Sequence, residues 1–274
     1  MCSHSNQAPS KRRLSNIQMA FKEINNEDNT AMLAFMISGS SWVLFIQGII
    51  QCGMVFKRKK STIYILSIIG LVSAIAELTI VLSFLYFNLD EHIYVVLVTP
   101  LWIIMIQAAT WVYCIRIKSL GGITKYDYII SKTPWVILMA QLPTIIIFNL
   151  KLYYKQLQVI NYISGICLSV IITVCEIIQF VGLLSKVLEM LEYRTFIKKL
   201  LRIEISLALV MMILFDISLL VFKIVKTPLD VVIRPFSYIL RIVLVIRFFD
   251  DLLDQVNESY LSSITSKRDL KTNK

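Results

Sequence analysis

Charged residues are scarce in this sequence. Asp, Glu, Lys and Arg make up 17% of it and hydrophobic residues 57%, whereas ordinary soluble domains carry about 25% charged residues. The scarcity excludes a typical soluble domain and indicates a polytopic membrane protein. The net charge of +10 does not indicate nucleic-acid binding, because the basic residues gather in short connections between apolar runs, where they act as topology signals.

Metal-binding and disulfide patterns are also lacking. Four of the five cysteines lie within apolar runs, and no two form a CxxC pair. The sequence therefore predicts neither a disulfide framework nor a zinc site, and we expect no cofactor. No internal repeat is visible, which weighs against transporters built from duplicated halves.

Two further absences narrow the class of membrane protein. The last apolar run has no lysine, which weighs against a light-driven rhodopsin, since such a pump needs a Schiff-base lysine there. None of the runs has a filter loop or a polar stripe along one face, as a channel would need. No catalytic signature stands out either, so we do not expect an enzyme.

Seven apolar runs are present, each long enough to cross a bilayer as a helix of about 20 residues. We therefore predict an all-α bundle of seven transmembrane helices. This divides the chain into a polar tail over residues 1–30, a transmembrane domain over 31–249 and a second tail over 250–274. The predicted spans are residues 31–56, 62–87, 93–115, 134–150, 159–184, 204–223 and 230–249.

Lysine and arginine are distributed unequally between the two ends of these spans. The first, third and fifth connections hold 13 of them, and the second, fourth and sixth hold 4 when Lys223, the last residue of the sixth span, is counted with its connection. Because such residues accumulate on the cytoplasmic side, we predict that the N-terminal tail is outside and the C-terminal tail is cytoplasmic. We favour the plasma membrane over an internal one.

The fourth span has a clear predicted start. Thr133 precedes Pro134, and threonine at the N-cap followed by proline at the first helical position is typical of a helix beginning. Gly121 and Gly122 break the chain after the third span. We therefore predict that the segment between the third and fourth spans is a loop.

The last span is apolar yet contains an arginine, Arg241, near its middle. An arginine in hydrocarbon costs several kcal/mol unless it has a partner. Counting 1.5 Å per helical residue places Glu77 of the second span and Asp216 of the sixth at about the same depth. Gln107 of the third span lies at a similar level, so these four residues form a predicted ligand or switch cluster.

The same residues have a structural interpretation. Buried ion pairs also serve to fix which helices pack together, and the sequence leaves both interpretations open. Arg234 and Arg247 lie close to the two ends of the last span. For them we expect the side chain to extend to the interface or to pair with a nearby aspartate.

An acidic cluster follows the last span. Asp250, Asp251 and Asp254 have the D-D-x-x-D spacing with which prenyl-diphosphate enzymes hold magnesium, because carboxylates three and four apart on a helix converge. Such an enzyme needs a second acidic motif, which the other cytoplasmic connections lack. These three are weak metal candidates, and we predict no metal site.

Basic residues in the third and fifth connections form a candidate surface for a cytoplasmic signalling partner. They are Arg116, Lys198, Lys199 and Arg202. The apolar and basic residues of the fifth connection alternate at helical spacing, so this segment could instead lie on anionic lipid or act as a topology anchor.

Arg234 to Tyr238 has the P-x-x-Y spacing of the last span of rhodopsin-like receptors, but at the outer end of the span rather than near the cytoplasm. The chain resembles a serpentine receptor in span number and orientation only. The leading hypothesis is a receptor-like protein with G-protein-coupled-receptor-like signalling and an unknown ligand. A small transporter or lipid-handling protein is the alternative, and a membrane-embedded prenyltransferase-like enzyme ranks third.

Overall fold

The computed structural model describes residues 28–59, 61–87, 89–119, 125–154, 156–190, 196–225 and 231–247. These residues form seven helices and no strand. Six are α2 (Asp28–Lys59), α3 (Thr62–Phe87), α4 (Glu91–Ser119), α5 (Lys125–Leu150), α6 (Leu157–Met190) and α7 (Phe196–Val225). The seventh covers residues 231–247 and is called the last helix below. The predicted all-helical class is confirmed.

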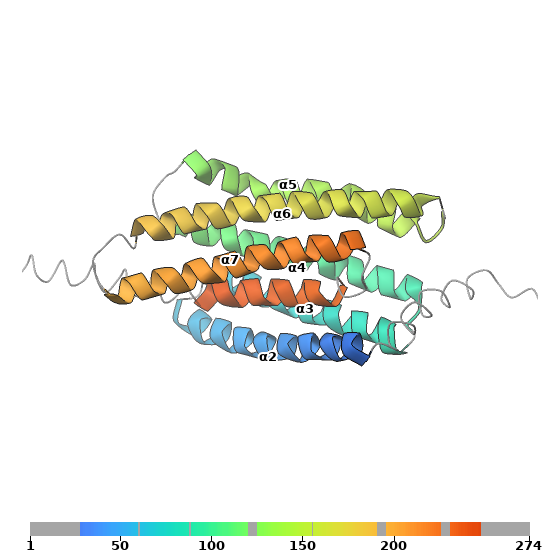
Figure 1. Ribbon diagram of the computed structural model, residues 1–274, viewed down its shortest axis with the longest axis horizontal. Coiled ribbons are helices and arrows are strands. Elements are labelled where there is room, and N and C mark those ends of the chain that lie inside the picture. The colour runs from blue at the N-terminus through green and yellow to red at the C-terminus, as the bar shows by residue number, and fades with distance from the viewer. Residues whose placement is uncertain are drawn as a thin grey trace, which may run out of the picture.

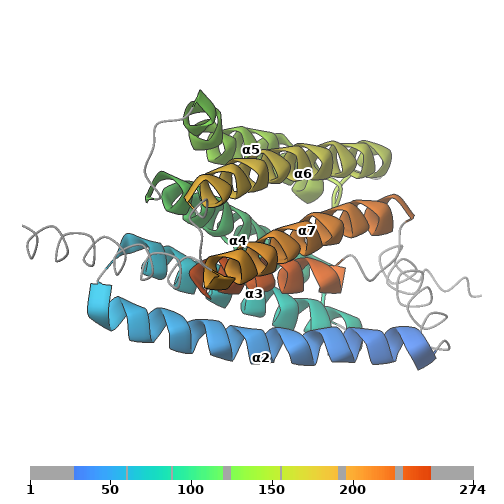
Figure 2. The same ribbon diagram turned by 60° about the vertical axis from the view of Figure 1, so that its left-hand side comes forward.

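The helices run roughly along one long axis (Figure 1), with α5 and α6 at one edge of the bundle and α2 at the other. Figure 2 shows α3, α4, α7 and the last helix between these edges. Among α2 to α7, the most extensive packing is between α3 and α4, followed by α5 with α6. Consecutive helices therefore pack as antiparallel neighbours, as short connections require.

Five helices in the described part of the chain are long and apolar enough to cross a membrane. They are Met32–Lys57, Thr62–Phe87, Glu91–Ser119, Asp127–Leu150 and Leu157–Leu183. These overlap the first five predicted spans, and the molecule is an integral membrane protein of the helical class. Residues 204–223 and 230–249 overlap α7 and the last helix, and their membrane crossing stays a prediction.

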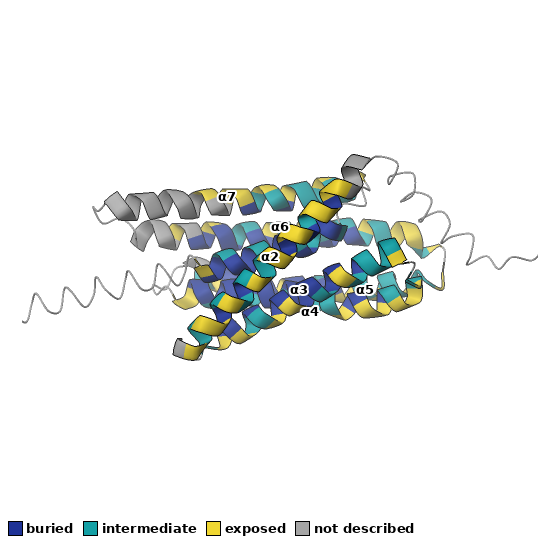
Figure 3. Ribbon diagram, turned by 90° about the horizontal axis from the view of Figure 1, so that it is seen from below, coloured by how far each residue is buried: buried dark blue, intermediate teal, exposed yellow. Residues whose placement is uncertain are grey.

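The outward faces of the bundle are apolar. Val43, Ile46 and Ile50 on α2, for example, each expose more than half of their surface. Figure 3 shows exposed residues following the outer side of α2, while α3 is largely buried. In water such faces would favour aggregation, but hydrocarbon solvates them without cost, so the exposed side chains are those that lipid should meet.

The last helix lies inside the bundle. Val232, Ile239 and Ile242 are almost completely buried in one apolar cluster with residues of α2, α3, α4 and α6. The close approach of α2 and α3 to the last helix depends on two glycines. A Cβ added at Gly48 of α2 or at Gly70 of α3 would come within 3 Å of side chains of the last helix, so glycine at these positions lets the helices approach one another.

The predicted start of the fourth span at Pro134 is wrong. Helix α5 begins at Lys125 and continues through Pro134. Proline has no N–H for the carbonyl four residues earlier, which is that of Ile130. That oxygen instead accepts from the Thr133 hydroxyl at 2.8 Å and the Cys114 thiol at 3.1 Å. Because both donors replace the lost bond, the helix continues instead of beginning here.

Candidate functional site

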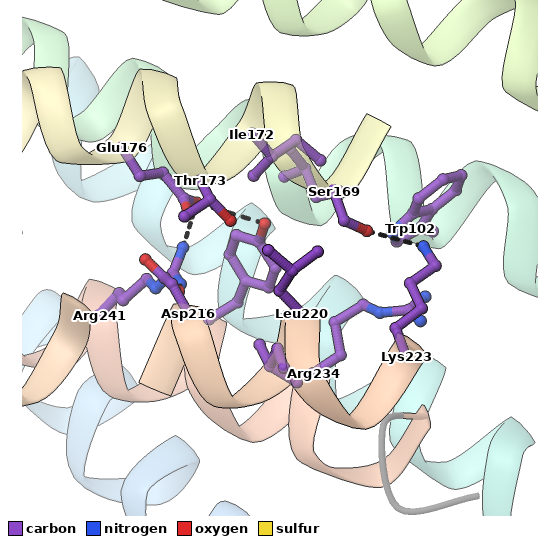
Figure 4. A pocket seen from close by; sticks show the side chains of 13 residues that line it. Trp102, Ser169, Ile172, Thr173, Glu176, Asp216, Leu220, Lys223, Arg234 and Arg241 are labelled. Atoms are coloured by element: carbon purple, nitrogen blue, oxygen red, sulfur yellow. Dashed lines mark hydrogen bonds and ion pairs between the residues drawn. The ribbon is translucent and has the colours of Figure 1, made fainter. Parts of the chain in front are cut away.

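A small cavity lies between α4, α6, α7 and the last helix. It has a volume of about 50 Å³ and is lined by charged side chains from three of these helices. The basic ones are Lys223, Arg234 and Arg241, and the acidic ones are Glu176 and Asp216. Figure 4 shows them pointing toward one another across the space between α6, α7 and the last helix.

The polar residues lie in two tiers because each helix supplies two of them seven residues apart. Two helical turns separate such residues by about 10.5 Å on one face. The inner tier consists of Glu176, Asp216 and Arg241, and the outer tier of Ser169, Lys223 and Arg234. Helix α7 runs antiparallel to the other two, which brings residues of matching tiers together.

The inner tier is a buried ion-pair cluster. The Arg241 side chain is 2% exposed and forms salt bridges to Glu176 of α6 and Asp216 of α7. Its guanidinium lies 4.7 Å from the centre of the Tyr238 ring, and the Tyr238 hydroxyl donates to Glu176 at 3.4 Å. Three helices are therefore joined through one arginine, and removing any charge would leave another buried without its partner.

The outer tier combines cations with an aromatic ring. The Lys223 ammonium donates to the Ser169 hydroxyl at 2.7 Å. The Arg234 guanidinium lies 5.7 Å from the centre of the Trp102 ring, which α4 contributes. Figure 4 places Trp102 beside Ser169 and Lys223, so this end of the cavity is rich in hydrogen-bond donors.

The predicted cluster is brought together only in part. Asp216 and Arg241 form a salt bridge. Glu77 is completely buried in α3 but does not line the cavity. It lies close enough to Arg234 for the two charges to attract each other, and within the described residues neither of its carboxylate oxygens has a hydrogen-bond partner.

Gln107 lies away from the charges. Its amide donates to the side-chain oxygen of Gln141 at 2.9 Å and so links α4 to α5. Glu176, which pairs with Arg241, was not predicted as a member of the cluster. The shared seven-residue spacing on three helices is a signal in the sequence that could have identified it.

The predicted coupling residues differ in their placement. Arg116 is buried and donates to the Tyr64 hydroxyl at 3.2 Å, so its guanidinium is not presented at the surface. Lys198, Lys199 and Arg202 belong to the first two turns of α7, and their side chains are outside the described part.

The acidic candidates Asp250, Asp251 and Asp254 also lie outside the described residues. Within the described ranges no three His, Cys, Asp or Glu side chains gather as metal ligands would. The prediction about these three aspartates, and the enzyme hypothesis that depends on it, therefore stay untested.

Comparison of the chain with protein-family models, with curated proteins and with solved structures finds no match in any of the three. The site must therefore be interpreted from its own geometry.

Proposed function

We propose that the protein is a seven-span receptor-like membrane protein in which the charged cavity is the ligand site and the Arg241 cluster is the switch. In this proposal the N-terminal tail is outside and the C-terminal tail is cytoplasmic. The observation that carries the proposal is one buried arginine that bridges acids on two different helices at the wall of a cavity.

The orientation makes the cavity suitable for a ligand from outside. With the N-terminus outside, α6 runs inward, so Ser169 lies nearer the outer face than Glu176. A ligand would therefore meet the outer tier first and reach Arg241 below it. Receptors and transporters both use such a layout, and they differ in whether the ligand is released on the other side.

Switching follows from competition for charge. The two salt bridges hold α6 and α7 against the last helix, and a ligand that changes the charge or hydration of the cavity changes their strength. A ligand shifts a two-state equilibrium only by its difference in affinity for the two states. Weaker Arg241 pairing would allow α6 and α7 to move relative to the last helix and α4, small helix shifts of the kind that signal across membranes.

The readout would be at the cytoplasmic ends of α6 and α7, next to Lys198 and Lys199. The sequence of this segment is rich in lysine and arginine, which fits an acidic cytoplasmic partner or anionic lipid. Movement of α6 and α7 would change how such a partner meets this segment.

Breaking the cluster by substitution tests the switch without a ligand. Spin labels at Lys118 of α4 and Ser185 of α6, both exposed near the same end of the bundle, report the distance between these helices. We expect Asp216→Asn and Glu176→Gln to shift this distance distribution in folded, reconstituted protein. Arg247→Gln, at an exposed arginine outside the cluster, serves as the control and should leave it unchanged.

An unchanged distribution in folded Asp216→Asn protein contradicts a switch and leaves the ion pairs as a structural feature. The transport alternative has its own measurement, which is uptake of radiolabelled carboxylates, amines and sugars into sealed liposomes that contain only this protein. Uptake that depends on Arg241 would favour transport over signalling.

A further inference from the structure

The outer tier presents hydrogen-bond donors from three helices to one small space. Lys223 of α7, Arg234 of the last helix and Trp102 of α4 all line the cavity. Lysine, arginine and tryptophan side chains donate hydrogen bonds and accept none. A ligand with acceptor oxygens is therefore matched to these donors, whereas an ammonium group only donates and would meet two cations of like charge.

The indole of Trp102 is independent evidence for a ligand with acceptor oxygens. Its nitrogen is buried, and among the described residues it has no acceptor. A buried donor without an acceptor is unfavourable, and a ligand oxygen at this position would satisfy it. The Arg234 guanidinium lies against the same ring, so two donors of different helices reach the region beside it.

The size of the cavity and the residues that line it narrow the class of ligand further. A volume of about 50 Å³ is well below the roughly 300 Å³ of a site for a whole drug-sized ligand. It suits a head group of a few atoms. Ile106, Ile172, Leu219 and Leu220 supply apolar wall beside the donors, which fits a carbon chain attached to that head group.

We propose that the outer tier binds the carboxylate of a monocarboxylic acid, with Lys223 and Arg234 as its cationic contacts and Trp102 as a third donor. A planar guanidinium matches a carboxylate in geometry. The proposal rests on the proposed function only in placing the ligand in the same cavity. The acid can come from lipid as a long-chain acid or from water as a short-chain one.

Removing the Glu77 carboxylate should strengthen carboxylate binding, whereas removing a cation of the outer tier should weaken it. Glu77 has a carboxyl group near Arg234, which in its charged form would compete with the ligand for that cation. Its two oxygens have no hydrogen-bond partner among the described residues, so Glu77→Gln removes the charge without breaking such a bond. Binding should become tighter in this variant, whereas loss of a merely structural contact would weaken it.

The test is equilibrium binding to the full chain in nanodiscs of zwitterionic lipid, with empty nanodiscs subtracted. The probes are radiolabelled dodecanoate and radiolabelled acetate, with dodecylammonium as competitor. We expect saturable binding of at least one carboxylate and no competition by the ammonium. Binding of dodecanoate alone assigns the lipid-borne source, and binding of acetate with similar affinity assigns the water-borne source.

Variants connect the binding to the outer tier. Lys223→Gln should weaken it by at least about tenfold, as loss of a charged hydrogen bond does, and Lys223→Arg should retain most of it. Trp102→Phe should weaken binding severalfold and Glu77→Gln should tighten it. Lys132→Gln, at an exposed lysine of α5, carries the same charge change and should have no effect.

Three results would overturn the proposal: no saturable binding of either acid, equal competition by dodecylammonium, or unchanged affinity in folded Lys223→Gln protein. None of these depends on signalling. The spin-label distances in Asp216→Asn protein test the switch without any carboxylate, so failure of the ligand assignment and failure of the proposed function give different results.

Discussion

Helix α2 lies at the edge of the bundle and the last helix lies in its interior. Their hydrophobicity alone would suggest the opposite arrangement. Helix α2 contains a 26-residue apolar segment, Met32–Lys57. Only 22% of the most apolar stretch of this segment is buried. The last helix carries Arg234, Arg241 and Arg247, yet most of its residues are buried. In a membrane the surrounding lipid is as apolar as leucine, so an apolar helix can lie at the edge.

Arg241 requires the opposite placement for its helix. A charge in hydrocarbon needs a partner, and only the interior of the bundle supplies Glu176 and Asp216. Glycine shows the same contrast within α2 itself. A Cβ at Gly48 would meet Leu71 and Val243, whereas nothing lies within 4 Å of one at Gly39. Polar side chains and close packing therefore mark the interior of this protein.

Arg241 should show the largest effect on stability. Arg241→Gln leaves two buried carboxylates without their cation, and we expect it to destabilise the fold by about 3 to 5 kcal/mol. Unfolding in mixed micelles, followed by circular dichroism, measures this change. The triple variant with Glu176→Gln and Asp216→Asn should recover most of the loss, since no unpaired charge remains. A triple variant no more stable than Arg241→Gln would contradict the charge argument.

Gly70 should come next. Its added Cβ would lie 2.7 Å from a methyl group of Ile242 and 3.0 Å from Ala108, so Gly70→Leu forces α3 away from its neighbours. We expect a loss of about 1 to 3 kcal/mol in the same unfolding experiment. Gly39→Leu makes the same change on the open face of α2 and should cost nothing or stabilise slightly. Equal losses at both positions would remove the distinction between the two faces.

Much of this arrangement could be predicted from the sequence, because apolar runs fix where helices lie. All seven predicted spans overlap helices. The rotation of each helix about its axis was harder to predict. Counting residues gives depth alone, so it placed Glu77, Asp216 and Gln107 near one level without showing which of them faces Arg241.

The beginning of α5 illustrates a second limit. Pro134 predicts a boundary by local chemistry, and the helix continues because a thiol from α4 and the Thr133 hydroxyl serve the Ile130 carbonyl. Cys114 is 16 residues from Ile130 in the chain, and no local pattern announces that contact. Tertiary packing here overrides a reliable local signal.

A smaller effect is expected at this junction. The Thr133 hydroxyl donates to Ile130 and accepts from the Gln179 amide at 2.5 Å. Thr133→Val removes both bonds while keeping the shape, and we expect a loss of about 1 kcal/mol, as for other hydrogen bonds between membrane helices. Ser40→Ala, which removes an exposed hydroxyl bond on α2, should change the free energy of unfolding by less.

The smallest effect concerns pH at one end of the bundle. Burial lowers the pKa of Lys151 below its usual 10.5, and Glu91 nearby partly offsets this. The unfolded chain therefore binds this proton more tightly, so the free energy of unfolding should rise with pH between the folded pKa and 10.5. Lys151→Met should flatten the rise in thermal midpoint over this range, and Glu91→Gln should steepen it.

The most direct measurement of the central role of Arg241 is a pair of double-mutant cycles. One combines Arg241→Gln with Glu176→Gln and the other combines it with Asp216→Asn, each measured by reversible unfolding in the same micelles. Residues in one salt-bridge network couple by about 0.5 to 3 kcal/mol, and we predict coupling of at least about 1 kcal/mol in both cycles. Additive losses in either cycle would contradict an arginine that joins α6 and α7 to the last helix.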